Sequence, residues 1–347
     1  MRHLLLLSCL VSLFVASSAF AVAPAAPAVQ KGDFKGVKLV EIPAWFKPSF
    51  LNIKEDINEA AESGKRVMVY FHQNGCPYCA KFVNDNLKDE RIVNYMAKHF
   101  DSVDINMWGD REVVALNGKS FNEKSYSASR KVWFTPTILF FDEKGKIALR
   151  INGYYPKEKF LIALRYVAEK KNTQLSFAEY YKQFSTVKKP GKLTTEPYFA
   201  KPNYNLAKLK QDNKPLAILF EQGNCKACDN LHKVTLQDKD TVDILKQFNI
   251  VQLDRWSDTP VIDLDGKSTT AKKLADKLGV TFSPYAVLYD KGVEVIRIEA
   301  FLRSFHVQSV FDYVLSGDYK KETSFQRYLE HRATAIRNTG KTVDIWK

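Results

Sequence analysis

The sequence is built from two copies of one pattern, and this limits the folds open to it more than any other property. A shift of 148 or 149 residues brings matching positions into register: Cys76 with Cys225, Cys79 with Cys228, Trp108 with Trp256, Phe134 with Phe282 and Pro136 with Pro284. Because this period is far longer than that of a solenoid repeat, each copy is expected to be a domain.

Both copies carry the same order of expected elements. A short apolar run, residues 66–71 or 216–220, predicts a buried strand that leads directly into a Cys-x-x-Cys. A helical pattern and a second strand follow, and then an Asn-Gly or Asp-Gly turn signals a hairpin. After a short helix, a strand that opens on a proline turns back as a further strand, and an amphipathic helix closes the copy. This order predicts an α/β fold with helices packed on a sheet.

The same reading divides the whole chain. The expected segments are a signal peptide at 1–21, an N-terminal extension at 22–44, a first domain at 45–185, a linker at 186–204, a second domain at 205–320, and an accessory helix and tail at 321–347. Within the region between the two copies, one helix is expected over 177–184, and Gly and Pro predict an extended stretch after it.

The first 21 residues indicate export. Arg2 precedes an apolar block over residues 4–15, and Ala19-Phe20-Ala21 forms a small-x-small cleavage site. No later stretch supplies the run of about 20 apolar residues that a membrane helix needs. The mature chain is therefore expected to be exported without a stable membrane anchor.

The way the positive charges are distributed along the chain argues against a nucleic-acid partner. The formal net charge is +13, and it stays near +12 after Arg2 is removed. Such a charge can attract polyanions. The lysines, however, are spread along the chain, and no motif interleaves basic with aromatic residues. A solvated basic surface is the preferred interpretation, and no nucleic acid is expected to bind.

All four cysteines of the mature chain belong to the two Cys-x-x-Cys motifs. Disulfides that stabilise exported proteins usually join distant segments, whereas these would close very small loops. A thiol at a helix N-terminus is stabilised as a thiolate. Cys76 and Cys225 are therefore expected to attack disulfides, and Cys79 and Cys228, one turn inside each helix, to resolve the mixed disulfide. This chemistry needs no cofactor, and none is expected.

Three other roles are open to a pair of cysteines in such a motif. A zinc ribbon places its two Cys-x-x-Cys pairs about 15–20 residues apart, far closer than here, so no metal site is expected. A cysteine hydrolase using His72 lacks a recognisable oriented acid partner. An inert disulfide stays open, more so for the second motif, since a duplicated domain can lose its activity.

Two X-Pro dipeptides complete the predicted constellation. Thr135-Pro136 and Ser283-Pro284 stand at the start of runs that read as buried strands, where proline needs a special reason. An edge strand is one explanation. A cis bond is favoured, because it would turn the preceding backbone toward the cysteines, where it can pair with a substrate chain.

With these residues assembled, the chain resembles the thioredoxin superfamily. Within it the chain is most similar to exported thioredoxin-related proteins of the SoxW type, and in part to the C-terminal domain of the transmembrane reductant conductor of the Dsb system. The stretches YFHQNGCPYC and LFEQGNCKAC carry the resemblance, together with LNGKS and the long run WFTPTILFFDEKGKIALRINGYYPKEKF. It covers residues 45–185 and, more weakly, 198–330. It implies two tandem thioredoxin-like α/β sandwich domains.

The resemblance also implies roles for residues. The four cysteines would be redox-active, and Thr135-Pro136 and Ser283-Pro284 would be substrate-facing cis-proline turns. The expected activity is that of a periplasmic protein thiol:disulfide oxidoreductase. Thr135 before the proline favours a reductase or isomerase. Exported cysteine-containing proteins would be partners, with a membrane or periplasmic dithiol as electron donor. A redox-silent binding or chaperone module built on the same folds is the alternative.

The sequence departs from that family at the usual proton acceptor. Tyr70 and Leu219 occupy the position of a buried carboxylate six residues before the first cysteine. His72 and Glu221, four residues before it, are candidate replacements, although a polar strand end facing water is the commoner explanation. A charged His72 would support a thiolate and a charged Glu221 would oppose it. Tyr78, inside the first motif, is expected to shape substrate contact.

Overall fold

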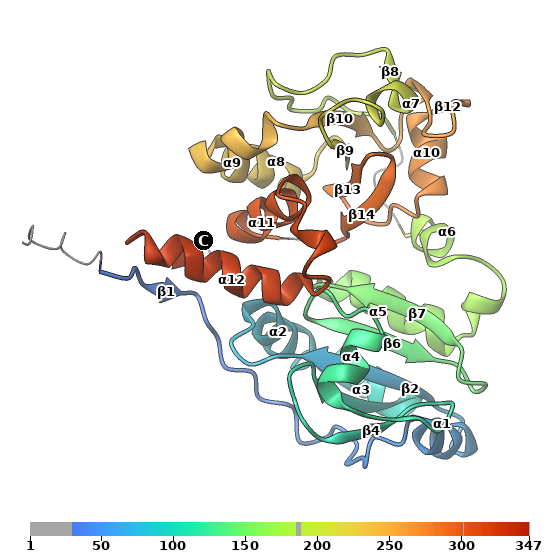
Figure 1. The fold of residues 1–347 in the computed structure, drawn as a ribbon. Coiled ribbons are helices and arrows are strands. Elements are labelled where there is room, and N and C mark those ends of the chain that lie inside the picture. Colours follow the sequence, from blue (N-terminus) through green and yellow to red (C-terminus); the bar gives the residue numbers. More distant parts are fainter. Residues whose placement is uncertain (1–29, 185–188, 301, 347) are drawn as a thin grey trace, which may run out of the picture.

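A computed structural model of the chain describes residues 30–184, 189–300 and 302–346. The predicted signal peptide, residues 1–21, lies outside these ranges. The two sequence copies form two α/β domains, which Figure 1 shows in blue to green and in yellow to red, with one long C-terminal helix between them.

The first domain is built on a four-stranded sheet of order β3-β2-β6-β7. Its strands are β2 (Arg66–His72), β3 (Phe100–Asn106), β6 (Thr137–Phe141) and β7 (Ile147–Asn152). β2 runs parallel to β3 and antiparallel to β6, and β7 closes a hairpin with β6. Every residue of β2 is buried, because this strand lies inside the sheet and helices cover both of its faces.

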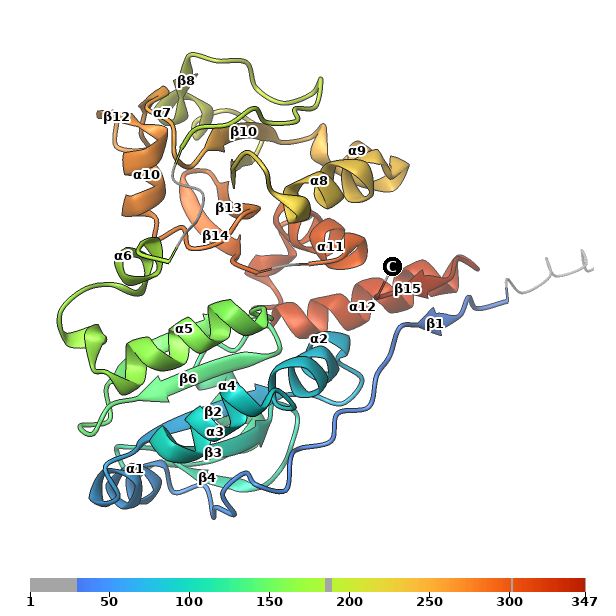
Figure 2. The same ribbon diagram turned by 180° about the vertical axis from the view of Figure 1, so that it is seen from behind.

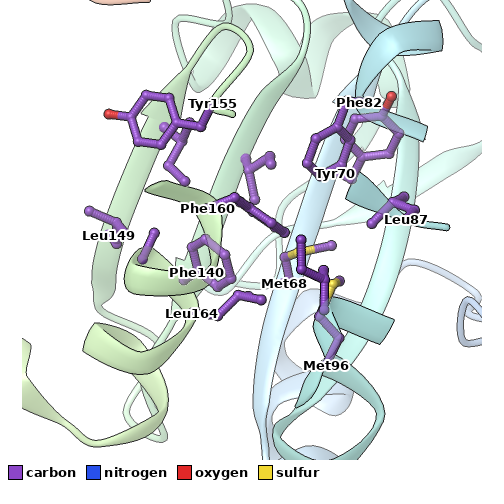
Figure 3. Packing of buried hydrophobic residues seen from close by; sticks show 14 of the residues in the cluster. Met68, Tyr70, Phe82, Leu87, Met96, Phe140, Leu149, Tyr155, Phe160 and Leu164 are labelled. Atoms are coloured by element: carbon purple, nitrogen blue, oxygen red, sulfur yellow. The ribbon is translucent and has the colours of Figure 1, made fainter. Parts of the chain in front are cut away.

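Alternate residues of β2 enter two separate cores, as the pleat of a strand requires. Met68 and Tyr70 belong to one core and Val69 to the other. The first core, drawn in Figure 3, lies beneath α2 (Pro77–Lys81), its continuation η1 (Phe82–Asn86), α3 (Glu90–His99) and α5 (Lys157–Ala168). The second lies beneath α1 (Ile53–Glu62) and α4 (Glu123–Ser129). The domain is therefore a three-layered α/β sandwich.

The second domain repeats this arrangement with the strand order β10-β9-β13-β14. Its strands are β9 (Leu216–Glu221), β10 (Asn249–Asp254), β13 (Tyr285–Asp290) and β14 (Val293–Ile298). One face carries α8 (Lys226–Lys233), η3 (Thr235–Gln237), α9 (Lys239–Leu245) and α11 (Ser304–Leu315). The other carries α7 (Leu206–Leu209) and α10 (Ala271–Lys277). The predicted tandem α/β fold is confirmed.

Both predicted hairpins are present. β4 (Glu112–Val114) pairs with β5 (Ser120–Asn122), and β11 (Pro260–Ile262) pairs with β12 (Ser268–Thr270). Gly118 and Gly266 turn these hairpins with φ of 78° each, a left-handed conformation that glycine adopts without strain.

The segment between the domains packs on both of them. After η2 (Lys171–Thr173), α6 (Phe177–Lys182) confirms the helix predicted over 177–184 and ends slightly earlier. Further along, Phe199 enters a core of the second domain, and β8 (Tyr204–Asn205) pairs with β11. The later part of the predicted linker therefore packs against the second domain.

Two segments from opposite ends of the described ranges pair with each other. η4 (Asp318–Lys320) leads into α12 (Phe325–Asn338), the predicted accessory helix, and β15 (Val343–Asp344) follows it. β1 (Phe34–Lys35), from the N-terminal extension, pairs in parallel with β15. Figures 1 and 2, taken from opposite sides, both show α12 between the domains with β1 beside it. Its Phe325, Tyr328 and Leu329 belong to a core of the second domain.

Candidate active site

The first cysteine pair, Cys76 and Cys79, lies where β2 gives way to α2. Cys76 is the N-cap of α2, and its Sγ accepts a hydrogen bond of 3.0 Å from the backbone N–H of Cys79. Pro77 follows at the first helical position, where its missing N–H costs nothing. The two cysteines form a disulfide, and both are buried. The sulfur that would attack a substrate thus sits on the free N–H groups of a helix start, which favour negative charge.

The second pair, Cys225 and Cys228, has the same geometry. Cys225 caps α8, its Sγ accepts from the N–H of Cys228 at 3.0 Å, and the two cysteines form a disulfide. Gly223, just before this pair, lies against Gly191 of the segment between the domains, so closely that a Cβ on Gly223 would meet Gly191 Cα at 2.7 Å.

Each pair faces its predicted X-Pro dipeptide. Both the Thr135-Pro136 and the Ser283-Pro284 peptide bonds are cis, as predicted. The carbonyl oxygen of Thr135 lies 3.5 Å from Cys76 Sγ, and that of Ser283 lies 3.6 Å from Cys225 Sγ. The hydroxyl of Thr135 also donates to Cys76 Sγ at 3.3 Å.

The two turns differ in how far they are covered. Thr135 and Pro136 are buried, whereas Ser283 and Pro284 are half-buried. The first pair is therefore the more enclosed of the two.

A glutamine and a tryptophan brace each site and were not singled out from the sequence as site residues. Trp108 Nε1 donates to Gln73 Oε1 at 2.7 Å, and Trp256 Nε1 donates to Gln222 Oε1 at 3.2 Å. The serine before the second proline donates to the same Gln222 oxygen at 3.5 Å. The internal repeat contained this signal, because both the glutamine and the tryptophan recur in the two copies.

His72 is buried at the end of β2, so the interpretation of this residue as a strand end facing water is wrong. Its Nε2 lies 3.0 Å from Asp104 Oδ2, and Arg111 donates to the same carboxylate at 3.0 Å. Burial would raise the pKa of Asp104, but the hydrogen bond from His72 and the charge of Arg111 outweigh it and hold that pKa below its ordinary value.

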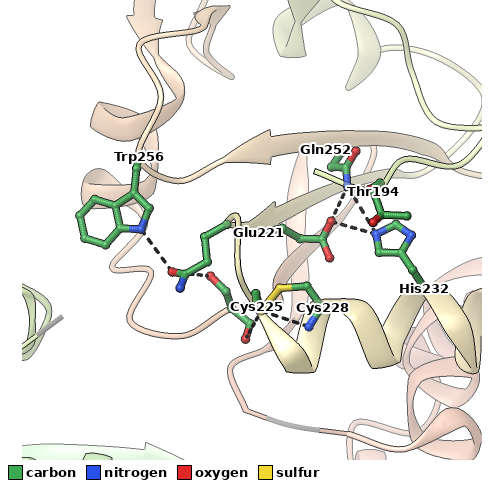
Figure 4. Close-up of a disulfide and its surroundings, with 9 residues drawn as sticks. Thr194, Glu221, Cys225, Cys228, His232, Gln252 and Trp256 are labelled. Carbon is green, nitrogen blue, oxygen red and sulfur yellow. Dashed lines mark hydrogen bonds and ion pairs between the residues drawn. A yellow bond between two sulfur atoms is a disulfide. The ribbon is translucent and has the colours of Figure 1, made fainter. Parts of the chain in front are cut away.

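Glu221 is buried as well, at 1% exposure, and does not face water either. Figure 4 shows it pointing toward His232 on α8, whose Nε2 lies 3.0 Å from Glu221 Oε2. The other ring nitrogen of His232 lies 2.7 Å from Glu196, and Gln252 donates to Glu221. Lys226, between the two cysteines of this motif, is exposed, and the cationic partner of Glu221 is His232.

The buried histidine of the second domain carries a shifted pKa. Burial would lower the pKa of His232, but its hydrogen bonds to Glu221 and Glu196 outweigh burial and raise the pKa above its ordinary value. His232 also lies one helical turn after Cys228 on α8, on the same face of the helix. A proton acceptor made of Glu221 and His232 is thus available beside the second pair. Its counterpart position in the first copy is Val83, so only a comparison of the copies would have revealed it.

Tyr78, inside the first motif, is buried between the first site, the second domain and the C-terminal tail. Whether it contacts a substrate stays a prediction. Its hydroxyl oxygen accepts from the backbone N–H of Arg303 at 2.7 Å, and its ring packs edge-on against those of His306 and Trp346. Burial raises the pKa of this phenol. In this arrangement Tyr78 connects the first site to the second domain.

The family model described as a thioredoxin-like domain matches residues 53–168 and again 202–315, which together make up well over half of the chain. The chain belongs to the thioredoxin-like domain family. Its two thioredoxin-like domains are those of the predicted tandem, each with one Cys-x-x-Cys at the start of a helix.

The solved structures to which the chain is similar include several thioredoxin-fold proteins. A thioredoxin-fold protein from Helicobacter pylori is 24% identical, with 39% of this chain and 91% of that one covered and a TM-score of 0.31. DsbH oxidoreductase is 14% identical over 44% and 95%, with a TM-score of 0.26. The oxidised C-terminal domain of Neisseria meningitidis DsbD is 14% identical over 35% and 92%, with a TM-score of 0.25. No match is found among curated proteins.

Two kinds of feature are missing from the described ranges. No helix there is both long and apolar enough to span a bilayer. No group of three or more His, Cys, Asp or Glu side chains in the same ranges is arranged to hold a metal ion.

The thioredoxin-like fold and the two pairs at disulfide distance support thiol–disulfide oxidoreductase chemistry. Each domain supplies a sulfur at a helix start, a second cysteine three residues later, and an X-Pro backbone beside the first sulfur. These are the groups needed for attack on a disulfide and for release of the mixed disulfide that results.

Proposed function

We propose that the protein is a periplasmic thiol:disulfide oxidoreductase that reduces or isomerises disulfides of exported cysteine-containing partners. Cys76 and Cys225 would attack, and Cys79 and Cys228 would resolve. A membrane or periplasmic dithiol would return the electrons. The apolar N-terminal block with its Ala19-Phe20-Ala21 site supports export, and threonine before the first cis proline supports reduction or isomerisation over net oxidation.

The observation that carries this proposal is the placement of both leading sulfurs. Each accepts the N–H of the cysteine three residues on, and each lies beside a carbonyl that precedes a cis proline. A structural disulfide needs neither feature. A nucleophilic thiolate needs the first, because the helix start stabilises its charge. A bound substrate chain can use the second, because the backbone before the proline offers it hydrogen-bonding groups.

The test is equilibration of the mature protein with glutathione buffers of graded ratio. Thiols are trapped, and the modified peptides of the two pairs are counted separately by mass. We expect both pairs to titrate at moderate potentials, with the order of the two potentials giving the favoured direction of any electron transfer between them.

If both pairs stay oxidised throughout, at potentials below about −300 mV as structural disulfides do, the oxidoreductase proposal fails. The redox-silent binding module then becomes the better description. The N-terminal extension and the tail must be kept in the protein tested, since Lys38 pairs with Gly75 and Trp346 packs against Tyr78 at the first site.

A further inference from the structure

A cavity of about 470 Å³ adjoins the first cysteine pair. Its floor is the first site itself, with residues 73–78, Phe134 and Thr135. Its other walls are the chain's own later segments: residues 302–306, one face of α12, and the N-terminal extension near Phe34 and Val37. Cys76 itself lines the cavity and is 4% exposed. The part of the wall formed by residues 302–306 and α12 is called the roof below.

The roof lies where a bound polypeptide would run. Gln326 of α12 accepts from Gln73 at 2.9 Å and donates to the carbonyl of Trp133 at 3.2 Å, so it bridges the two loops of the first site. The ring of Phe134 packs against that of Phe325 at 5.1 Å between centroids. An extended substrate chain beside Thr135 would have to displace these contacts.

The roof is fixed rather than hinged. The inward side chains of α12 form part of a hydrophobic core of the second domain, so moving the helix would expose that core. At its far end, Arg337 donates to the carbonyl of Gly32 at 2.8 Å, and β1 pairs with β15. Near the start of the roof, the backbone N–H of Arg303 donates a hydrogen bond to the Tyr78 hydroxyl. Three independent attachments therefore keep the roof over Cys76.

The size and chemistry of the cavity suit a small polar molecule. Its volume falls within the range of roughly 300–1,000 Å³ that small-ligand pockets occupy. Amide side chains such as Gln73 and Asn106 line it, together with one acid, Glu330, and one base, Arg337. Burial lowers the pKa of the wall's histidine, His306, to about 4, so its ring is uncharged at neutral pH. Amide groups and single charges of each sign match the backbone and the termini of an amino acid or short peptide.

We propose that the first pair exchanges with disulfides of amino acids and short cysteine peptides, and that the fixed roof excludes folded proteins from it. This inference rests on the proposed function and narrows the partners of one of its two sites. At the second pair, the half-buried Ser283 and Pro284 leave backbone that a larger partner can reach.

The exchange has two steps. The Cys76 thiolate attacks one sulfur of the small disulfide, whose S–S bond breaks as a mixed disulfide forms and one thiol leaves. The Cys79 thiolate then attacks Cys76 Sγ, closes the protein disulfide and releases the second thiol. Two electrons pass from the protein to the substrate. A dithiol donor, dithiothreitol in the experiment, reduces the pair before the next turnover.

The test uses the full mature chain in single turnover. The protein is reduced with dithiothreitol, freed of it, and mixed with glutathione disulfide, cystine or insulin. Oxidation of each pair is followed separately by thiol trapping and peptide mass, so that the second pair serves as an internal control. We expect the small disulfides to oxidise the first pair readily. Insulin should oxidise it at least tenfold more slowly than it oxidises the second pair.

Two neighbouring substitutions on α12 sharpen the test. Thr334→Trp places an indole in the cavity, and Ala335→Trp places the same group on the exposed side of the helix. Thr334→Trp should slow oxidation of the first pair by glutathione disulfide at least tenfold. The second pair should keep its rate, which also shows that the second domain is folded. Ala335→Trp should change neither rate.

The possible failures are distinguishable. If insulin oxidises both pairs equally fast in the unmodified protein, the roof does not exclude proteins, and the inference is overturned while the proposed function stands. Equal rates for the Thr334→Trp and Ala335→Trp proteins with glutathione disulfide would show that the cavity is not the route to Cys76. If no disulfide oxidises either pair, the proposed function itself fails.

Discussion

A single sulfur atom in each domain combines the roles of helix cap and candidate nucleophile. Cys76 and Cys225 both accept a backbone N–H of the helix that they begin, a position usually held by Ser, Thr, Asp or Asn. A thiolate accepts such a bond more strongly than a neutral thiol does, because the bond is charge-assisted. The same contact that starts the helix therefore favours the reactive form of the residue.

Replacing the second cysteine of each pair should trap the intermediate. In Cys79→Ser and Cys228→Ser proteins, we expect glutathione disulfide to leave one glutathione attached to Cys76 and to Cys225, respectively. The reason is that no thiol remains one turn away to release it. Peptide mass measures the adduct. Cys76→Ser, which leaves Cys79 in place, is the matched control, and an equal adduct on Cys79 there would contradict the assigned order of attack.

His232 should make stability depend on pH. Its pKa is higher in the folded protein than in the unfolded chain, so its stabilising contribution is complete below about pH 6.5 and is lost as the pH rises through the raised value. His232→Gln should therefore cost more at pH 6 than at pH 9, by on the order of 1 kcal/mol in the free energy of unfolding.

Urea unfolding at the two pH values measures this difference. His331→Gln, at an exposed position of α12, is the control and should cost little at either pH. A cost of His232→Gln that grows with pH would contradict the assignment of a raised pKa.

At the scale of elements, α5 joins the domains through a buried lysine. Lys159 lies 3.6 Å from the centroid of the Tyr155 ring and 4.8 Å from that of Phe282 of the second domain, and its Nζ donates to Thr281 at 3.3 Å. Burial lowers the pKa of this ammonium far below its usual range. In the unfolded chain the amine is protonated and hydrated, and burial in the folded protein disfavours that charged form. Lys159 therefore lowers the free energy of unfolding, and its cost grows as the pH falls from the unfolded-state pKa to the folded-state pKa.

Lys159→Met should accordingly stabilise the protein. Methionine fills a similar volume and removes the cost of burying an amine, which is about 1–2 kcal/mol at neutral pH. Thermal unfolding across a pH series measures the effect, which should grow toward acid pH. Lys157→Met, on the exposed side of the same helix, is the matched control. A destabilised Lys159→Met protein would show instead that the lysine is held as a paired cation.

Elements that follow a local pattern were predictable from the sequence, and contacts across the chain were not. Asn117-Gly118 and Asp265-Gly266 fix their hairpins through conformations that only a few residues adopt readily, and the apolar run 66–71 has no exposed face. The bond between Gln73 and Gln326 spans 253 positions and has no period or motif to reveal it.

Tyr78 shows the same limit at the candidate site. Its place within the Cys-x-x-Cys was certain from the sequence, but its partners Arg303, His306 and Trp346 come from the second domain and the tail. Likewise, the buried pairing of Glu221 with His232 depends on how α8 lies on β9, which propensity alone does not determine.

At the scale of the whole molecule, the C-terminal segment packs against both domains. Phe325, Tyr328 and Leu329 complete a core of the second domain, while Gln326 and Thr334 face the first site. The chain therefore cannot lose this segment without affecting both domains.

Deleting residues 323–347 should unfold the second domain and uncover the first pair. Removing a buried Phe or Leu side chain costs about 2–5 kcal/mol, and several are lost together, against a total stability that is typically about 5–15 kcal/mol. Limited proteolysis should cut the second domain rapidly and spare the first. Alkylation of reduced Cys76 should be faster than in the full chain. A truncated protein whose second domain resists proteolysis would show that α12 is a detachable cover.

Because β1 pairs with β15, the covering of Cys76 depends on the order in which the parts of the chain fold. β1 comes before the first domain in the chain, and β15 comes after the second. Domains generally fold as units, the N-terminal one first, so the first domain can fold before residues 323–346 join it. Until then the roof does not cover Cys76. The exclusion of folded proteins that we propose therefore begins only when β1 and β15 have paired.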